Sequence, residues 1–487
     1  MKSEKLYDAI TEVEEPLVEE AAAPLEKKKK KALRLRWVSA LAAVLALAIL
    51  LTAVLRPGRE GSLTVYALES PVYPATAPYP DVSALLSGEN VDQSKLEQEY
   101  EAWEQARMQR VKAKNSYSAA DLRHYLEAAI PAYLAGHEGE NAACSPLNLY
   151  LALAMLAETT EGESRAQLLS LLGTRDMDSL RSLCENLFAA NYVDDGADKS
   201  LLAGAIWLRE EMDYKTETLQ RLAQSYYAAS FRGPMGSEDY DAQLREWINQ
   251  QTGNRLTEQT KSLAFDPRTV LALTTTVDFT AHWYSAFEPE RTEDASFHAG
   301  NGDLTCKMMR LDEEGLYYWG RQFGAVDLQF KENGRMRFLL PDEGVSPEAL
   351  LRDPEALSFL LGAGYDDWAQ KKSLIIHLGL PKFDISSQLS LEQSLKELGI
   401  TAAFDPETAD FSPLTDSEGV FLSQVEHGVR VAVNEEGVTA SAVSMLIGAG
   451  AAMPPDEEID FTLDRPFLFA IYGMDNLPLF VGIVNQP

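Results

Sequence analysis

Cysteine is scarce in this 487-residue chain, and its scarcity excludes two kinds of protein. The three cysteines, Cys144, Cys184 and Cys306, are an odd number and show no metal-binding spacing. They therefore form neither a disulfide framework nor a cysteine-based metal site. We expect all three to behave as small buried hydrophobic residues.

Positive charge is also in short supply. The chain has 43 Lys and Arg against 75 Asp and Glu, for a formal net charge of −32. Nucleic acids and heparin-like polyanions are bound by clustered Lys and Arg that release counterions. We therefore expect no nucleic-acid partner and no heparin-like site.

The common catalytic motifs are missing as well. The sequence has no H-E-x-x-H, no G-x-S-x-G and no phosphate-binding G-x-x-x-x-G-K. None of the histidines has ligand spacing, and each is predicted to be structural: His124, His137, His282, His298, His377 and His427. We predict that the protein is not an enzyme and needs neither a metal nor a cofactor.

One long hydrophobic run is present, at residues 37–55, where Ser39 and Thr52 are the only polar residues. As a helix it would span about 28 Å, enough for one membrane crossing. Basic residues cluster just before it, between 27 and 36, which predicts a cytoplasmic N-terminus. The sequence thus predicts a single-pass cell-membrane protein whose remainder is extracellular. A cleaved signal peptide is the alternative, although no small-residue cleavage pattern follows the run.

The chain divides by composition into four parts. Residues 1–36 form a cytoplasmic tail with acidic and basic stretches, followed by the predicted span. Residues 56–116 form a predicted extracellular stalk. Residues 56–92 are rich in Pro, Tyr and Ser, which suits an extended segment, and residues 93–115 are charged and helix-prone, which predicts a short helix. Residues 117–487 form the main domain, and with 46% hydrophobic residues the chain can build a large core.

The main domain mixes helical and strand patterns. Ser145 and Pro146 supply an N-cap and a first-turn proline to a run that is apolar all round, which predicts a buried central helix. Apolar runs at 336–341, 461–472 and 479–485 predict core strands. The class is mixed α/β.

Residues 437–453 stand out because they contain neither charge nor proline. Nothing in these side chains prevents a buried strand, yet their length and glycines suit an exposed loop. Small residues at 438, 440, 442 and 444 would share one face of such a strand. We predict a loop that can also become a strand; a flexible linker is the alternative.

Taken in order, these segments resemble a serpin over residues 117–487. The resemblance is carried by SPLNLYLALAML at 145–156, EWINQQTGNRL at 246–256, DFTAHWYSAFEPERTEDASFH at 278–298, LPKFDI at 380–385, VNEEGVTASA at 433–442, RPFLFAIY at 465–472 and LFVGIVN at 479–485. It implies a serpin fold with three β-sheets, about nine helices and an exposed reactive loop at about 437–458. With the predicted anchor, the chain looks like a bacterial membrane-anchored member.

The resemblance also implies a mechanism. A serine or cysteine protease attacks the loop and becomes an acyl-enzyme; the cut loop then enters the largest sheet and distorts the tethered protease. The hinge that begins this insertion is implied at Glu435, Glu436, Gly437, Val438, Thr439, Ala440, Ser441 and Ala442.

A cluster that controls sheet opening is implied at Ser145, Asn148, Thr275 and His427, with Trp283 at the top of the sheet. Two of the four cluster positions differ from the usual family residues, and we hypothesise that Asn148 supplies the amide lost at Thr275.

The scissile bond is predicted among Gly450, Ala451, Ala452 and Met453. Small residues there favour an elastase-like or subtilisin-like target over a trypsin-like one. We expect a monomer. The alternative function is a non-inhibitory serpin-fold module that binds a partner or senses cleavage at the cell surface, but the uncharged hinge favours inhibition.

Overall fold

The computed structural model describes residues 65–80, 93–196, 198–331, 334–362, 368–438 and 457–487. These residues belong to one structural unit, which spans Ser62–Pro487. The predicted membrane segment at 37–55 lies outside the described residues.

The described part of the chain contains eleven α-helices: α4 (Gln93–Lys114), α5 (Ala119–Tyr133), α6 (Pro146–Thr159), α7 (Gly162–Leu172), α8 (Met177–Asn191), α9 (Thr216–Ser225), α10 (Glu238–Gln251), α11 (Thr257–Thr260), α12 (Pro347–Arg352), α13 (Pro354–Leu360) and α14 (Glu392–Glu397). The count exceeds the predicted nine because α4 precedes the predicted domain and α11 is a four-residue turn.

Eight strands form one sheet, which we call the insertion sheet: β1 (Ala67–Glu69), β3 (Val193–Asp194), β4 (Lys199–Arg209), β5 (Ala228–Gly233), β6 (Leu271–His282), β12 (Phe383–Ser390), β13 (Leu422–Val433) and β14 (Gly437–Val438). Along its main path the order is β1-β5-β4-β6-β14-β13-β12.

The second sheet has nine strands: β2 (Ala142–Cys144), β7 (Glu293–Ala299), β8 (Gly302–Trp319), β9 (Phe323–Gln329), β10 (Arg335–Pro341), β11 (Lys371–Pro381), β15 (Glu458–Thr462), β16 (Phe467–Tyr472) and β17 (Pro478–Val484). The expectation of three separate sheets is corrected for the described residues. The 18-residue strand β8 pairs with β7 and β11 and, at its end, with β9, which joins two groups of strands into one network.

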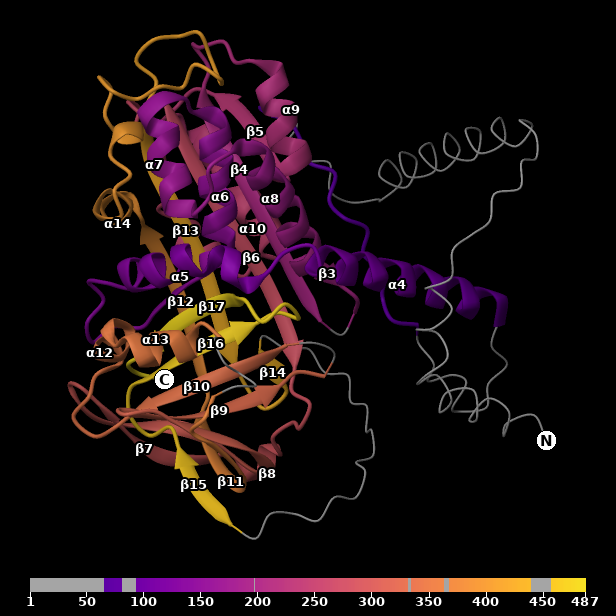
Figure 1. The fold of residues 1–487 in the computed structure, drawn as a ribbon, viewed down its shortest axis with the longest axis vertical. Coiled ribbons are helices and arrows are strands. Elements are labelled where there is room, and N and C mark those ends of the chain that lie inside the picture. The colour runs from indigo at the N-terminus through magenta and orange to yellow at the C-terminus, as the bar shows by residue number, and fades with distance from the viewer. Residues whose placement is uncertain (1–64, 81–92, 197, 332–333, 363–367, 439–456) are drawn as a thin grey trace. The chain divides into compact units, whose positions relative to one another are not determined.

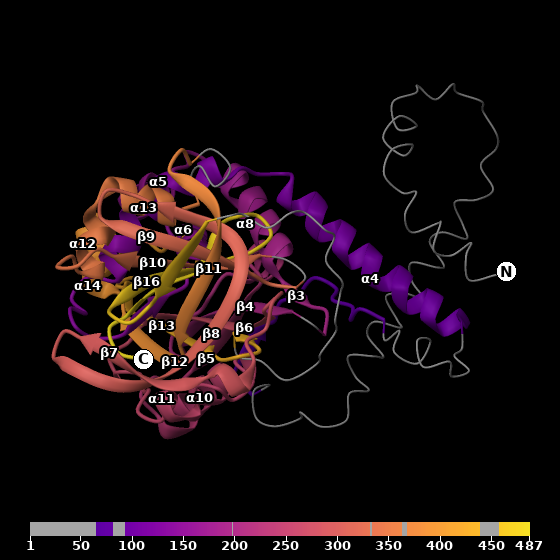
Figure 2. The ribbon, with the colours of Figure 1, turned by 90° about the horizontal axis from the view of Figure 1, so that it is seen from below.

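Helices cover both faces of the insertion sheet. Helices α5, α6 and α8 lie on one side of it, and α10 and α11 lie on the other (Figures 1 and 2). Strand β4 shows why: Leu202 and Ile206 pack into the core that contains α6, whereas Ala203 and Trp207 pack with α10. A strand covered on both faces is apolar at nearly every position.

The predicted central helix is confirmed as α6. The Ser145 side chain accepts a hydrogen bond from the Asn148 backbone N–H at 3.4 Å, and Pro146 occupies the first turn. All fourteen helical residues are buried. The helix therefore packs on every side and fixes the position of its N-terminus beneath the sheet.

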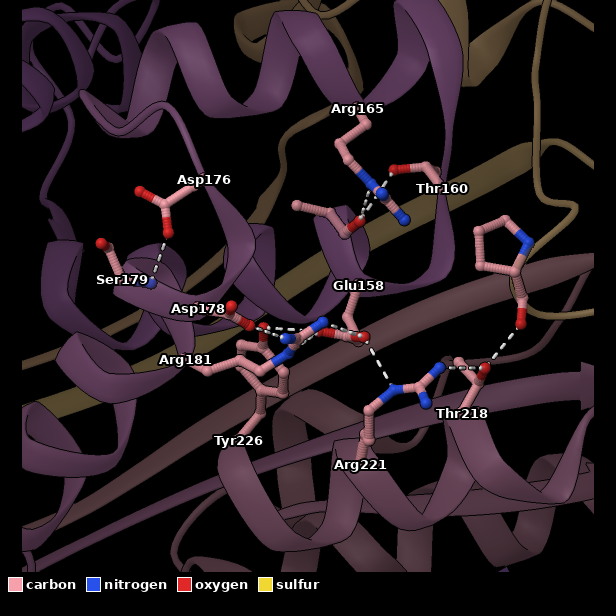
Figure 3. Close-up of polar contacts among 12 residues, drawn as sticks. Glu158, Thr160, Arg165, Asp176, Asp178, Ser179, Arg181, Thr218, Arg221 and Tyr226 are labelled. Atoms are coloured by element: carbon pink, nitrogen blue, oxygen red, sulfur yellow. Dashed lines mark hydrogen bonds and ion pairs between the residues drawn. The ribbon is translucent and has the colours of Figure 1, made fainter.

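A buried carboxylate holds the other end of α6 (Figure 3). Glu158 accepts two hydrogen bonds from Arg181 of α8, at 2.7 and 3.0 Å. Arg221 of α9 and the Tyr226 hydroxyl donate to the same carboxylate at 2.9 and 3.0 Å. Three helices are thus tied together by one charge that would be costly to bury alone.

The described residues before Tyr117 pack on the domain. Strand β1 pairs with β5 at the edge of the insertion sheet, and α4 lies along α8. The Tyr73 ring stacks on Tyr192 with centroids 5.1 Å apart. The helix predicted over 93–115 is present as α4. Where it is described, the predicted stalk therefore extends the insertion sheet by one strand.

The predicted single-pass membrane localisation requires correction. Among the helices of the described ranges, none combines the length and apolar character needed to cross a bilayer. The structure thus gives the anchor no support. The cysteine prediction is confirmed, since Cys144, Cys184 and Cys306 are all buried and unpaired.

Candidate functional site

The predicted hinge includes a short strand, β14, that already lies inside the insertion sheet. Val438 of β14 pairs with Ala281 of β6 on one side and with Val433 of β13 on the other. Its side chain is buried in the core. The first two residues of the predicted loop-to-strand segment therefore occupy strand positions before any cleavage.

Glycine is required at the first of these positions. Gly437 has φ of 156°, and a Cβ atom built there would lie 2.0 Å from the Ala281 carbonyl oxygen. Because that contact is with backbone, a side chain could not move aside to relieve it. The glycine lets β14 approach β6 closely.

Trp283 anchors the turn that leads into β14. Its backbone N–H donates to the Glu436 carbonyl at 3.0 Å, and its indole Nε1–H donates to the Asn434 carbonyl at 3.0 Å. The Asn434 side-chain oxygen accepts from the backbone N–H groups of Glu436 and Gly437 at 3.0 and 3.2 Å. The turn is thus held by Trp283, the residue that follows β6, and by its own Asn434 side chain.

Glu435 ties the predicted hinge to two residues outside the strands, Lys382 between β11 and β12 and Thr292 directly before β7. Lys382 Nζ lies 2.8 and 3.1 Å from its carboxylate oxygens, and the Thr292 hydroxyl donates at 2.9 Å. Burial opposes ionisation, but the hydrogen bonds from Lys382 and Thr292 hold the pKa of Glu435 below its ordinary value. Glu436 is exposed, so the two adjacent carboxylates differ in role.

His427 lies further along β13, where β13 and β6 pair directly. The Ser145 backbone N–H donates to His427 Nε2 at 2.9 Å. Nε2 is therefore an acceptor, so the ring proton is on Nδ1 and is donated to the Thr275 hydroxyl at 2.8 Å. These contacts join the N-terminus of α6, strand β13 and strand β6 at one point.

The imidazole is neutral at physiological pH. Its side chain is fully buried, and this desolvation lowers the pKa of His427 to about 3. Protonation of Nε2 would also remove the acceptor that Ser145 uses. The site therefore depends on the neutral tautomer.

Asn148 lies in the same cluster. In the part of the chain that the structure describes, however, its side chain forms no hydrogen bond with His427. Its side-chain Nδ2 donates to the Thr276 carbonyl of β6 at 2.9 Å. The hydroxyl of Thr275 contacts His427 instead. Of the predicted cluster, the structure brings together Ser145, Thr275 and His427, with Asn148 beside them, while Trp283 contacts the turn that leads into β14.

The remaining predicted positions, Thr439, Ala440, Ser441 and Ala442 of the hinge and Gly450, Ala451, Ala452 and Met453 of the scissile region, lie outside the described residues. The structure adds residues that sequence reasoning missed. Asn434 could have been found, because Asn before Glu-Glu-Gly is typical of a turn stabilised by its own side chain. Lys382 and Thr292 have no such signal, since they are far from Glu435 in the chain.

Comparison with known proteins agrees with this arrangement. Residues 131–487 match the model of the serpin (serine protease inhibitor) family, and the chain belongs to that family. The chain is 28% identical over 391 residues to the leukocyte elastase inhibitor of Sus scrofa, covering 78% of this chain and all of the relative. It is 29% identical over 368 residues to Serpin A3-5 of Bos taurus, covering 72% of this chain and 84% of the relative.

A solved structure shows the same fold. The thermophilic serpin tengpin in its native state superposes with a TM-score of 0.67 at 25% identity, covering 76% of this chain and 94% of tengpin. Serpins are a family of protease inhibitors, and curated relatives of this chain are named as inhibitors.

Proposed function

We propose that this protein is a suicide inhibitor of serine or cysteine endopeptidases, which it traps as acyl-enzymes when the cut reactive loop enters the insertion sheet. The observation that carries the proposal is β14. Gly437 and Val438 already lie between β6 and β13, and the uncharged sequence that follows them can continue the same strand.

Insertion has a defined physical cost and gain. Beyond β14, strands β6 and β13 pair directly over Leu271–Thr276, so an entering strand must separate them. The hydrogen bond between His427 and Thr275 spans the two strands and must also break. In return, the new strand forms backbone hydrogen bonds on both sides and buries alternate side chains.

The target class is proposed from the loop sequence. Small residues at Gly450–Met453 fit elastase-like or subtilisin-like specificity pockets. The name of the relative from Sus scrofa, leukocyte elastase inhibitor, is consistent with that class.

The experiment mixes the protein with elastase and with subtilisin and looks for a complex that survives a denaturing gel. We expect such a complex, and we expect the loop-cleaved protein to melt well above the intact one. Cleavage of the loop with neither a stable complex nor a rise in melting temperature would reject the inhibitor mechanism. It would favour the non-inhibitory binding or cleavage-sensing alternative.

A charge placed within the strand should convert the inhibitor into a substrate. In Ala442→Arg a guanidinium must enter the sheet during insertion at a cost of several kcal/mol, which delays insertion and lets deacylation finish. Val438 is not used for this test, because its side chain is already buried in the sheet before cleavage. The matched control is Glu436→Arg, because Glu436 is exposed and precedes the strand. Each variant must first show a parental circular dichroism spectrum, and undiminished complex from Ala442→Arg would contradict the mechanism.

A further inference from the structure

A cavity of about 440 Å³ lies where strands β8 and β9 separate. The two strands pair only at Tyr317–Val326, Tyr318–Ala325 and Trp319–Gly324. Before Tyr317, β8 follows β11, while β9 continues beside β10 as far as Gln329. This fork in the second sheet leaves room that no strand fills.

The chain that follows β6 forms the third wall of the cavity. The Tyr284 backbone N–H donates to the Gln329 carbonyl at 2.8 Å, which places Tyr284 and Ser285 against the end of β9. The volume is within the range of small-molecule sites in proteins. The fork is therefore a built pocket with walls from three separate segments.

The lining combines apolar surface with the carboxylates of Glu313, Glu314 and Asp327, of which Asp327 is paired with Arg335 and Arg337. Leu328 and the Tyr318 ring are buried, while Leu316 and Tyr284 are 37% and 56% exposed. Glu313 lines the same cavity and is hydrogen-bonded to Ser285, but among the described residues it forms no ion pair. Burial raises the pKa of the Glu313 carboxyl, as expected for an anion without a compensating cation.

We infer that this fork is a binding site for a small organic cation, an aryl-alkyl amine, with its ammonium group on Glu313 and its apolar part against Leu316, Leu328 and the Tyr284 ring. The ammonium would supply the missing charge partner in a partly desolvated site. No covalent step is involved.

The pocket is connected to the hinge through adjacent residues. Tyr284 directly follows Trp283, and Gln329 directly precedes Phe330. The Trp283 and Phe330 rings stack with centroids 5.3 Å apart and an interplanar angle of 19°. Because Trp283 holds the turn before β14, a bound amine that fixes these walls should keep the hinge in its native position. This effect on inhibition rests on the proposed function, whereas the binding site does not.

The binding test uses the full chain and three matched probes, 2-phenylethylamine, 2-phenylethanol and 3-phenylpropanoate, in isothermal titration. We expect saturable binding of the amine alone. Glu313→Gln should weaken amine binding by about tenfold to a hundredfold, the loss of one charge-assisted hydrogen bond. Glu288→Gln is the control, because it removes the same charge from an exposed site outside the cavity and should bind like the parent.

A second variant keeps the test informative if Glu313→Gln does not fold. Leu316→Arg, at a partly exposed position, brings a tethered cation to the rim and should abolish amine binding. Equal binding of all three probes, or parental affinity in folded Glu313→Gln, would overturn the site.

Two further measurements separate this inference from the proposed function. Saturating amine should raise the melting temperature of the parent and not of Glu313→Gln. Amine should also slow formation of the protease complex in the parent alone. If no protease forms a complex, the proposed function fails while the binding and melting results still decide the site.

Discussion

Acidification should destabilise the native protein through His427, whose pKa is about 3 in the folded state against about 6.5 in an unfolded chain. The folded-state value is depressed, so the unfolded state binds the extra proton first. The contribution of His427 to the free energy of unfolding is therefore fully present above about pH 6.5 and is lost progressively as the pH falls toward 3. Between pH 7.5 and pH 5 this one residue should cost about 2 kcal/mol of unfolding free energy.

The assay is urea unfolding of the parent and of His427→Gln at pH 7.5 and pH 5. Glutamine cannot take up a proton, yet it keeps one acceptor for Ser145 and one donor for Thr275. We expect the variant to be less stable than the parent at pH 7.5 and to lose about 2 kcal/mol less on acidification.

Two exposed histidines contribute to the free energy of unfolding with the opposite pH dependence. Asp303 raises the pKa of His298, and Asp312 raises that of His377, so their contributions are present at low pH and lost as the pH rises. Because the parent and His427→Gln both contain these two histidines, their contributions cancel when the two proteins are compared at the same pH. His298→Gln is the control and should not flatten the acid dependence. An equal loss on acidification in parent and His427→Gln would refute the reasoning.

Three further changes test other parts of the structure. Glu158→Gln should cost about 3 kcal/mol in urea unfolding because Arg181 and Arg221 lose their common counter-charge; a loss below about 1 kcal/mol would show that the network in Figure 3 is marginal. Glu426→Gln should stabilise the protein at pH 7 and not below pH 4, because burial raises the pKa of Glu426 and its ionised form opposes folding; equal midpoints at both pH values would count against this. Tyr73→Ala should cost about 1–2 kcal/mol through its lost ring stacking, whereas the exposed neighbour Val72→Ala should not; equal melting temperatures for the two variants would contradict the packing of this segment.

The amino-acid order determined the features that depend on neighbouring residues. Ser145 and Pro146 cap α6 because an N-cap side chain and a proline act on the same helical turn. The buried state of the three cysteines followed from their number and spacing. The charge-free, proline-free run at 437–453 predicts strand character, and β14 begins at its first residue, Gly437.

Only the tertiary structure decided which distant residues meet. Lys382 and Glu435 form an ion pair although 53 positions separate them, and nothing in either local sequence marks the partner. The pairing of β1 with β5 makes an edge strand of a segment whose composition is typical of a stalk. The long strand β8 joins two strand groups into one network, where the family resemblance implied three separate sheets. Local patterns specify helices, turns and strand character, whereas strand neighbours and buried charge partners depend on the simultaneous packing of the whole chain.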